Sequence, residues 1–196
     1  MKLINKRTIL VGLAFLSICA FWQMYDSIVP LILTKTFHMN ETFSGAIMAA
    51  DNILALFLLP FFGSVSDKSH SKLGKRMPFI LFGTGCAIIL MNSLPLLDNS
   101  YAAQPSGFKT ASFVIVLGLL LVAMGTYRAP AVALMPDVTP KPLRSRANAI
   151  INLMGAVGGI LYLGVAAVLY PNSKTAGLDH VNYQPLFIVV SAIMFV

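Results

Sequence analysis

The stretch GSVSDKSHSKLGKRMPF, residues 63–79, interrupts an otherwise apolar part of the sequence. It carries one acidic and four basic side chains between two apolar stretches, residues 43–62 and 78–97. A helix needs ~20 apolar residues to cross about 30 Å of hydrocarbon, and both flanking stretches have that length. Residues 63–79 are therefore predicted to form a short polar connection between two membrane-spanning helices.

The whole sequence has the composition of a membrane protein. Of its residues 57% are hydrophobic and 11% are charged, whereas soluble domains carry about 25% charged residues. The predicted spans are residues 9–33, 43–62, 78–97, 111–134, 147–169 and 185–196. Because the last stretch is short, we expect the sequence to stop inside a sixth helix. The predicted fold is an all-α membrane bundle without a soluble domain.

The basic residues predict how this bundle is oriented. If the N-terminus is cytoplasmic and the connections alternate, ten basic residues fall inside and three fall outside, which is the positive-inside pattern. The inner set is Lys2, Lys6, Arg7, Lys68, Lys72, Lys75, Arg76, Lys141, Arg144 and Arg146, and the outer set is Lys35, Lys109 and Lys174. The net charge of +7 thus reflects topology, and no nucleic-acid partner is expected.

Three charged side chains fall within the predicted spans: Asp26, Asp51 and Arg128. Charges in the hydrocarbon region are costly, so they mark candidate functional sites. At 1.5 Å per helical residue, the two acids both lie about 10–12 Å below the outer surface. Two carboxylates at one depth suit a proton or cation site. Alternatively, each only bonds a neighbouring helix, or Asp26 faces a water-filled vestibule.

Asp26 has neighbours that suit a solute site. Trp22 lies one helical turn before it and Gln23 three residues before it, which places all three on one side of the helix. An indole ring can cover the C–H face of a sugar while the carboxylate and the amide bind its hydroxyls. In the other interpretation, Trp22 packs between helices and its N–H bonds Gln23 or Asp26.

Small residues and prolines within the spans predict how the helices pack. Gly155 and Gly159 form a GxxxG pair, which lets a second helix approach closely. Pro30, Pro60 and Pro130 each remove a backbone donor and are expected to bend or interrupt their helices.

The spacing Gly63-x-x-x-Asp67, followed by Gly74, Lys75 and Arg76, resembles the signature loop between helices 2 and 3 of the major facilitator superfamily. The resemblance implies that Asp67 is the acid of a cytoplasmic gate. Lys75 and Arg76 would then be its basic partners. A few charge-assisted bonds of this kind make a breakable latch.

A second stretch, GTYRAPAVALMPD at residues 125–137, is followed by Arg144. It is similar to the end of helix 4 in sucrose-type carriers. The long form of the signature loop also resembles the glycoside–pentoside–hexuronide:cation symporters. The resemblance implies that Arg128 takes part in substrate binding and that Asp137 is an acid of the inner loop. Leu117 stands where those carriers have an acid in helix 4.

Together these features predict the N-terminal six-helix half of a twelve-helix carrier in the plasma membrane, with the C-terminal half absent. The expected function is sugar symport coupled to H⁺ or Na⁺, with Asp26, Trp22, Gln23 and Arg128 at the solute and Asp51 at the ion. An exporter of the same superfamily and a non-transporting membrane subunit or sensor are the alternatives. No catalysed reaction, cofactor or metal centre is expected. The bilayer is the remaining partner.

Overall fold

The computed structural model describes residues 5–69, 71, 74–175 and 177–195, and this part of the chain contains helices and connections but no strand. The elements in chain order are α1 (Asn5–Leu31), the π turn η1 (Ile32–Thr36), α2 (Glu41–Lys68), α3 (Met77–Ala103), α4 (Gly107–Val138), the 3₁₀ turn η2 (Lys141–Leu143), α5 (Arg144–Leu169), α6 (Asn172–Thr175) and α7 (Gln184–Phe195). Among the described residues, five helices are long and apolar enough to span a membrane.

The ends of α2 and α3 show why the helices begin where they do. The side chain of Asn40 accepts a hydrogen bond from the Thr42 backbone N–H at 3.0 Å, which satisfies one free donor of the first turn of α2. Glu41 adds a negative charge at the positive end of the same helix. Pro78 stands in the first turn of α3, where a missing N–H costs nothing.

The helices extend beyond the apolar stretches read from the sequence. For example, α4 has 32 residues and runs from Gly107 to Val138, whereas the prediction was residues 111–134. The prediction for the third span was wrong at its C-terminal end. That span was expected to end at residue 97, but α3 continues to Ala103 and carries Asp98 as a buried helical residue. Helical hydrogen bonding continues through polar residues, so loss of hydrophobicity does not by itself end a helix.

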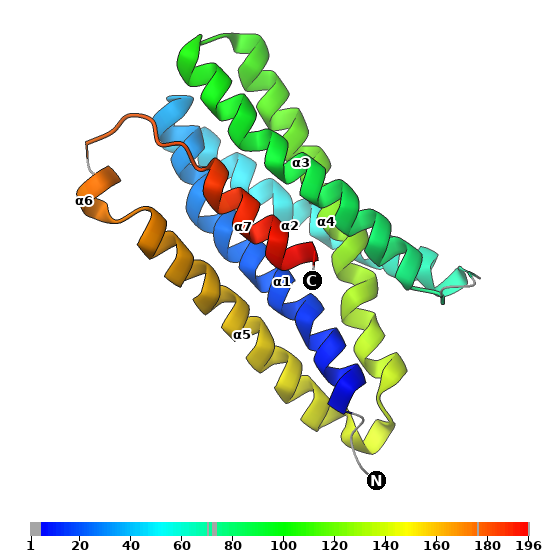
Figure 1. Ribbon diagram of the computed structural model, residues 1–196. Coiled ribbons are helices and arrows are strands. Elements are labelled where there is room, and N and C mark those ends of the chain that lie inside the picture. Colours follow the sequence, from blue (N-terminus) through cyan, green and yellow to red (C-terminus); the bar gives the residue numbers. More distant parts are fainter. Residues whose placement is uncertain (1–4, 70, 72–73, 176, 196) are drawn as a thin grey trace.

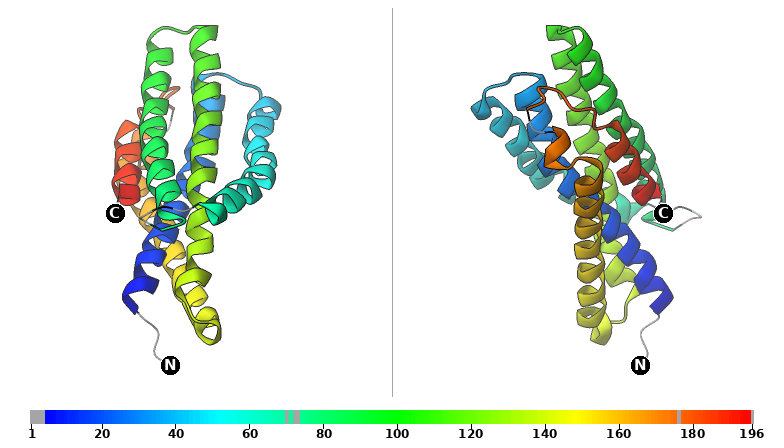
Figure 2. Two further views of the ribbon diagram at one scale, coloured as in Figure 1. Left: turned by 90° about the vertical axis from the view of Figure 1, so that its right-hand side faces the viewer. Right: turned by 60° about the vertical axis from the view of Figure 1, so that its left-hand side comes forward.

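Two helix pairs make the most extensive contacts in the bundle. The pairing is α1 with α5 and α3 with α4, while α2 packs chiefly on α4 and α7 packs on α1 and α3 (Figure 1). Figure 2 shows that α2 lies at one side and is bent along its length, and Pro60 lies inside this helix. Pro30 lies inside α1, two residues before the π turn η1 begins, so it does not end the helical path.

Glycine determines how closely α1 and α5 approach. A Cβ atom on Gly158 would collide with the backbone of Leu16, and one on Gly155 would lie 2.9 Å from Cys19 Sγ. Gly159, the second member of the predicted pair, has no such contact, because its nearest neighbour is Gln23 Oε1 at 3.8 Å. The closest approach therefore depends on Gly155 and Gly158, which are three residues apart.

Candidate functional site

The exposed side of α1 carries the residues proposed for the solute. Asp26 is exposed, while Trp22 and Gln23 are half-buried on either side of it. Trp22 lines a pocket with residues of α2 and α4, and Gln23 lines an open groove with Gly155 and Gly159 of α5. This order follows from the 100° rotation per residue, which puts Asp26 angularly between the other two. Asp26 thus lies at the middle of a face that α2 and α4 border on one side and α5 on the other.

Arg128 lies against Trp22 in the pocket between α1, α2 and α4. Its guanidinium carbon is 5.4 Å from the centroid of the Trp22 ring, which is within cation–π range. The pocket encloses about 20 Å³, and Asp51, Leu54 and Gly125 are among its lining residues. This volume holds about one water molecule, so a sugar does not fit inside it.

Asp51 has polar and aromatic neighbours from other helices as well as one from its own helix. Asn52 Nδ2 does donate to Asp51 Oδ1 at 2.7 Å, but Asp51 also shares the pocket with Trp22 and Arg128. It also lies within electrostatic range of Asp26. Helix α2 brings Asp51 to this side because it packs on α4, the helix that carries Arg128.

The indole N–H of Trp22 has no hydrogen-bond partner among the described residues, although the atom is buried. The packing interpretation required a bond from this N–H to Gln23 or Asp26, and the structure does not contain one. Phe21 and Tyr25 instead hold the ring through edge-on contacts, with centroid distances of 5.4 and 5.3 Å. The indole is fixed by its neighbours and keeps one free donor.

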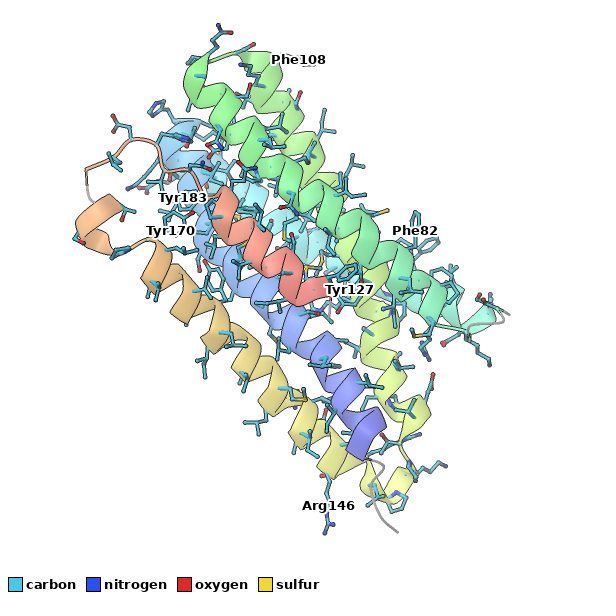
Figure 3. All side chains as sticks on the ribbon, in the orientation of Figure 1. Phe82, Phe108, Tyr127, Arg146, Tyr170 and Tyr183 are labelled. Atoms are coloured by element: carbon cyan, nitrogen blue, oxygen red, sulfur yellow. The ribbon has the colours of Figure 1, made fainter. Side chains whose placement is uncertain are left out.

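A buried hydrogen bond joins α4 to α1 at the residue before Arg128. Tyr127 Oη lies 2.6 Å from Ser17 Oγ and donates to the Ala14 carbonyl at 3.1 Å. Figure 3 shows Tyr127 near the middle of the bundle. On its other side, α4 approaches Gly83 of α3 so closely that a Cβ there would lie 2.8 Å from the Tyr127 backbone nitrogen. Because Arg128 is the next residue, these contacts position its guanidinium relative to Trp22.

At the opposite end from the α1–α2 connection, Arg76 joins two acids. Its Nη2 lies 2.7 Å from Asp67 Oδ1, and its Nε lies 2.6 Å from Asp137 Oδ2. Arg76 precedes α3, Asp67 lies in the last turn of α2 and Asp137 lies in the last turn of α4. We call these three residues the inner latch. It holds the ends of three helices together through one guanidinium.

The other residues of the predicted loop motif have different environments. Gly74 has φ +100°, a conformation that favours glycine. Gly63 lies within α2 and has open space around it, and Lys75 is exposed. Arg144 bonds the carbonyl of Pro136 at 2.9 Å, so it caps the end of α4 rather than pairing with Asp137.

Sequence reasoning missed a buried polar cluster at the other end of the bundle. Asp98 was assigned to a connection and His180 was given no role, but Asp98 is fully buried and His180 Nδ1 lies 3.7 Å from its Oδ2. The sequence contained only a weak signal for this buried cluster. It consisted of an acid directly after an apolar run and a histidine in an outer connection.

Comparison with known proteins identifies the family. A model of the Major Facilitator Superfamily matches residues 11–196. The chain belongs to the major facilitator superfamily. This membership confirms the predicted all-α membrane fold, and the superfamily is one of transporters rather than enzymes.

Several curated relatives resemble this superfamily member. Sucrose transport protein SUC3 of Arabidopsis thaliana is 34% identical over 158 residues, which are 74% of this chain and 26% of that protein. Sucrose transport protein SUT3 of Oryza sativa subsp. indica is 36% identical over 154 residues, which are 71% of this chain and 30% of that protein. The chain thus spans less than a third of these relatives. No solved structure gives a significant match.

Proposed function

We propose that this chain forms the N-terminal part of a sugar carrier of the plasma membrane, coupled to H⁺ or Na⁺. The observation that carries the proposal is the meeting of Trp22, Asp51 and Arg128 from three helices beside the exposed Asp26. Ionisable groups at membrane depth face a pathway or a partner charge, because hydrocarbon disfavours them. Similarity to two sucrose transport proteins supports sugar as the class of solute.

The exposed face of α1 has the chemistry that a sugar needs. The Trp22 indole offers an apolar ring and a free N–H, and the Asp26 carboxylate offers charged acceptors for hydroxyls. Arg128 lies against the same ring and contributes fixed donors. Gln23 supplies an amide from the side of the face that borders α5. The pocket inside this half is too small for a sugar, so we place the solute on the open face, with the remainder of the carrier as its second wall.

Asp51 is the proposed coupling residue. It lines the same pocket as Arg128 but is not within ion-pair distance of it in the described structure. The arriving H⁺ or Na⁺ neutralises Asp51 and so changes the field on Arg128, which itself touches the solute-binding ring. The electrostatic repulsion between the Asp51 and Asp26 carboxylates links the ion to the solute in the same way.

The inner latch is proposed to keep the cytoplasmic end closed between transport steps. Arg76 bonds two acids from two different helices, so its release frees α2 and α4 from α3 at the same time. Each bond is partly exposed to water and is therefore weak enough to break in each cycle. Asp67→Asn should impair transport while solute binding remains.

Transport assays with the complete carrier test these roles. Labelled sugars, with sucrose among them, are followed in cells and in proteoliposomes, with and without a protonophore or a Na⁺ gradient. Asp51→Asn should still exchange solute but should no longer accumulate it, because the neutral amide imitates the ion-bound state. Asp26→Asn should weaken solute binding itself.

The matched control is Asp179→Asn, which removes an exposed acid from the connection before α7 and should change neither property. Accumulation that survives Asp51→Asn would show that the coupling role is wrong. Unchanged solute affinity in Asp26→Asn would remove that residue from the solute site. Outward movement of every tested solute would favour the exporter alternative.

A further inference from the structure

A buried polar cluster joins three segments at the end of the bundle opposite the inner latch. Asp98 and Asn99 belong to the last turns of α3, Thr36 is the last residue of η1, and His180 lies in the connection to α7. We call these four residues the outer cluster. Asp98 is 0% exposed, and Thr36 is also buried. Thr36 lies ten residues after Asp26, about 15 Å along the helix, so the cluster is separate from the proposed solute face.

Hydrogen bonds arrange the imidazole of His180 beside the carboxylate of Asp98. His180 Nε2 lies 3.0 Å from Asn99 Oδ1, and its Nδ1 lies 3.3 Å from Thr36 Oγ1. The same Nδ1 is 3.7 Å from Asp98 Oδ2. Because Asn99 Oδ1 can only accept, Nε2 carries a proton, and Nδ1 is the atom whose proton can change.

Asp98 lacks the partners that an ionised buried carboxylate requires. Neither of its oxygens has a hydrogen-bond partner of good geometry among the described residues, although the Thr36 hydroxyl lies nearby. Such a group costs several kcal/mol unless it is neutralised or paired. Two arrangements meet this requirement: a protonated Asp98 beside a neutral His180, or an ionised Asp98 beside a protonated His180. Both contain one more proton than the fully deprotonated pair.

We propose that Asp98 and His180 together form a proton-binding site at the outer end of the bundle, and that its proton holds η1 and the connection before α7 onto α3. When the proton leaves, a buried negative charge remains without a counter-charge. The three segments then separate until water reaches the carboxylate. The proton concentration outside the membrane thus sets how firmly this end is closed.

The other titratable groups around the outer cluster do not provide a counter-charge for Asp98. Tyr183 and Tyr170 lie near each other where α7 begins and α5 ends, with ring centroids 5.2 Å apart (Figure 3). Burial raises the pKa of both phenols, and the nearby Asp98 raises the pKa of Tyr183 further, so both remain neutral at physiological pH. Lys109 donates to carbonyls at the end of α3 and not to Asp98. Among the described residues, His180 is the basic group within ion-pair distance of Asp98.

The first test is the heat stability of the complete purified protein at about pH 5.5 and 8.5, read as the fraction that stays monodisperse. The folded pair keeps a proton that the unfolded chain releases, so stability should fall as the pH rises. We expect a loss of about 4 °C or more in the unmodified protein. Asp98→Asn has the shape of the protonated acid, so it should abolish most of this loss. It should also be more stable than the unmodified protein at the higher pH.

Asp179→Asn is the matched control, because it removes an exposed acid one residue before His180, and it should keep the full pH dependence. Equal pH dependence in Asp98→Asn and in the unmodified protein would overturn the proposal. A purely structural Asp98 would instead give a variant that is less stable at every pH, which would also overturn it.

The second test needs no variant. Diethyl pyrocarbonate modifies neutral imidazoles, and mass spectrometry compares His180 with the exposed His38 in the same sample. The ratio of His180 to His38 modification should rise at least about threefold between pH 6 and 8, because deprotonation opens the outer cluster, while the already exposed His38 corrects for the pH dependence of the reagent. A constant ratio would contradict the proposed opening.

Discussion

The inner latch allows a prediction with a calculable size. Arg76 is 10% exposed, whereas its partners Asp67 and Asp137 are 60% and 50% exposed. Ion pairs with one solvated partner are worth about 0.5–1 kcal/mol each. Arg76→Gln loses both pairs and should therefore shift the opening of this end by about 1–2 kcal/mol, which is a factor of roughly 5–30 in the open population.

Ser66 provides the probe for this opening. It is 0% exposed, and Arg76 Nη1 lies 3.4 Å from its hydroxyl, so the latch covers it. In a background with Cys19 and Cys86 replaced by serine, Ser66→Cys reports opening through its rate of alkylation by a permeant maleimide. Arg76→Gln should raise this rate about 5–30-fold, since the rate follows the open population.

Two comparisons decide whether the latch is the cause. Lys75→Gln removes the adjacent, exposed cation and should change the rate by less than about twofold. The double variant Asp67→Asn with Asp137→Asn should match Arg76→Gln, while each single variant should give only part of the effect. An unchanged rate in Arg76→Gln, or an equal rise in Lys75→Gln, would refute the reasoning.

Three further predictions concern topology and packing. Cysteine at exposed Ser173 should react with an impermeant reagent in intact cells and cysteine at exposed Ser145 should not; the reverse would invert the proposed orientation. Gly158→Ala should lower the free energy of unfolding by about 1–3 kcal/mol in heat-unfolding measurements, because its Cβ meets the α1 backbone. Gly164→Ala, whose Cβ lies in open space, should not lower it. Tyr127→Phe should lower the free energy of unfolding by about 1 kcal/mol in denaturant titration. An unchanged free energy would show that the hydrogen bond from Tyr127 to α1 does not stabilise the bundle.

Local sequence predicted the helices and the loop motif with useful accuracy. Apolar length identified the spans because the bilayer sets the number of helical residues that cross it. The motif spacing identified the superfamily, and the family match confirmed this. The boundary of α3 was wrong because hydropathy does not register helical hydrogen bonds that continue through polar residues such as Asp98.

The partners of the charged side chains were harder to predict. Trp22, Gln23 and Asp26 could be placed on one side of α1 because helical rotation is a local property. That α2 and α4 bring Asp51 and Arg128 to the Trp22 side, while α5 borders Gln23, depends on which helices pack together. Helix faces in a membrane bundle have similar apolar composition, so periodicity does not select the neighbour.

The sequence by itself determined that this is a multi-span helical membrane protein with a basic loop between two of its spans, because the bilayer and the helical repeat act on consecutive residues. Only the tertiary structure decided that Arg76, one of the two basic partners expected for Asp67, also joins Asp137, that Arg128 lies over Trp22, and that His180 meets a buried Asp98. These contacts join residues from 9 to 106 positions apart. The physical reason is that a charge in a low-dielectric interior is stabilised by whichever counter-charge the packing brings near, and packing is a property of the whole bundle.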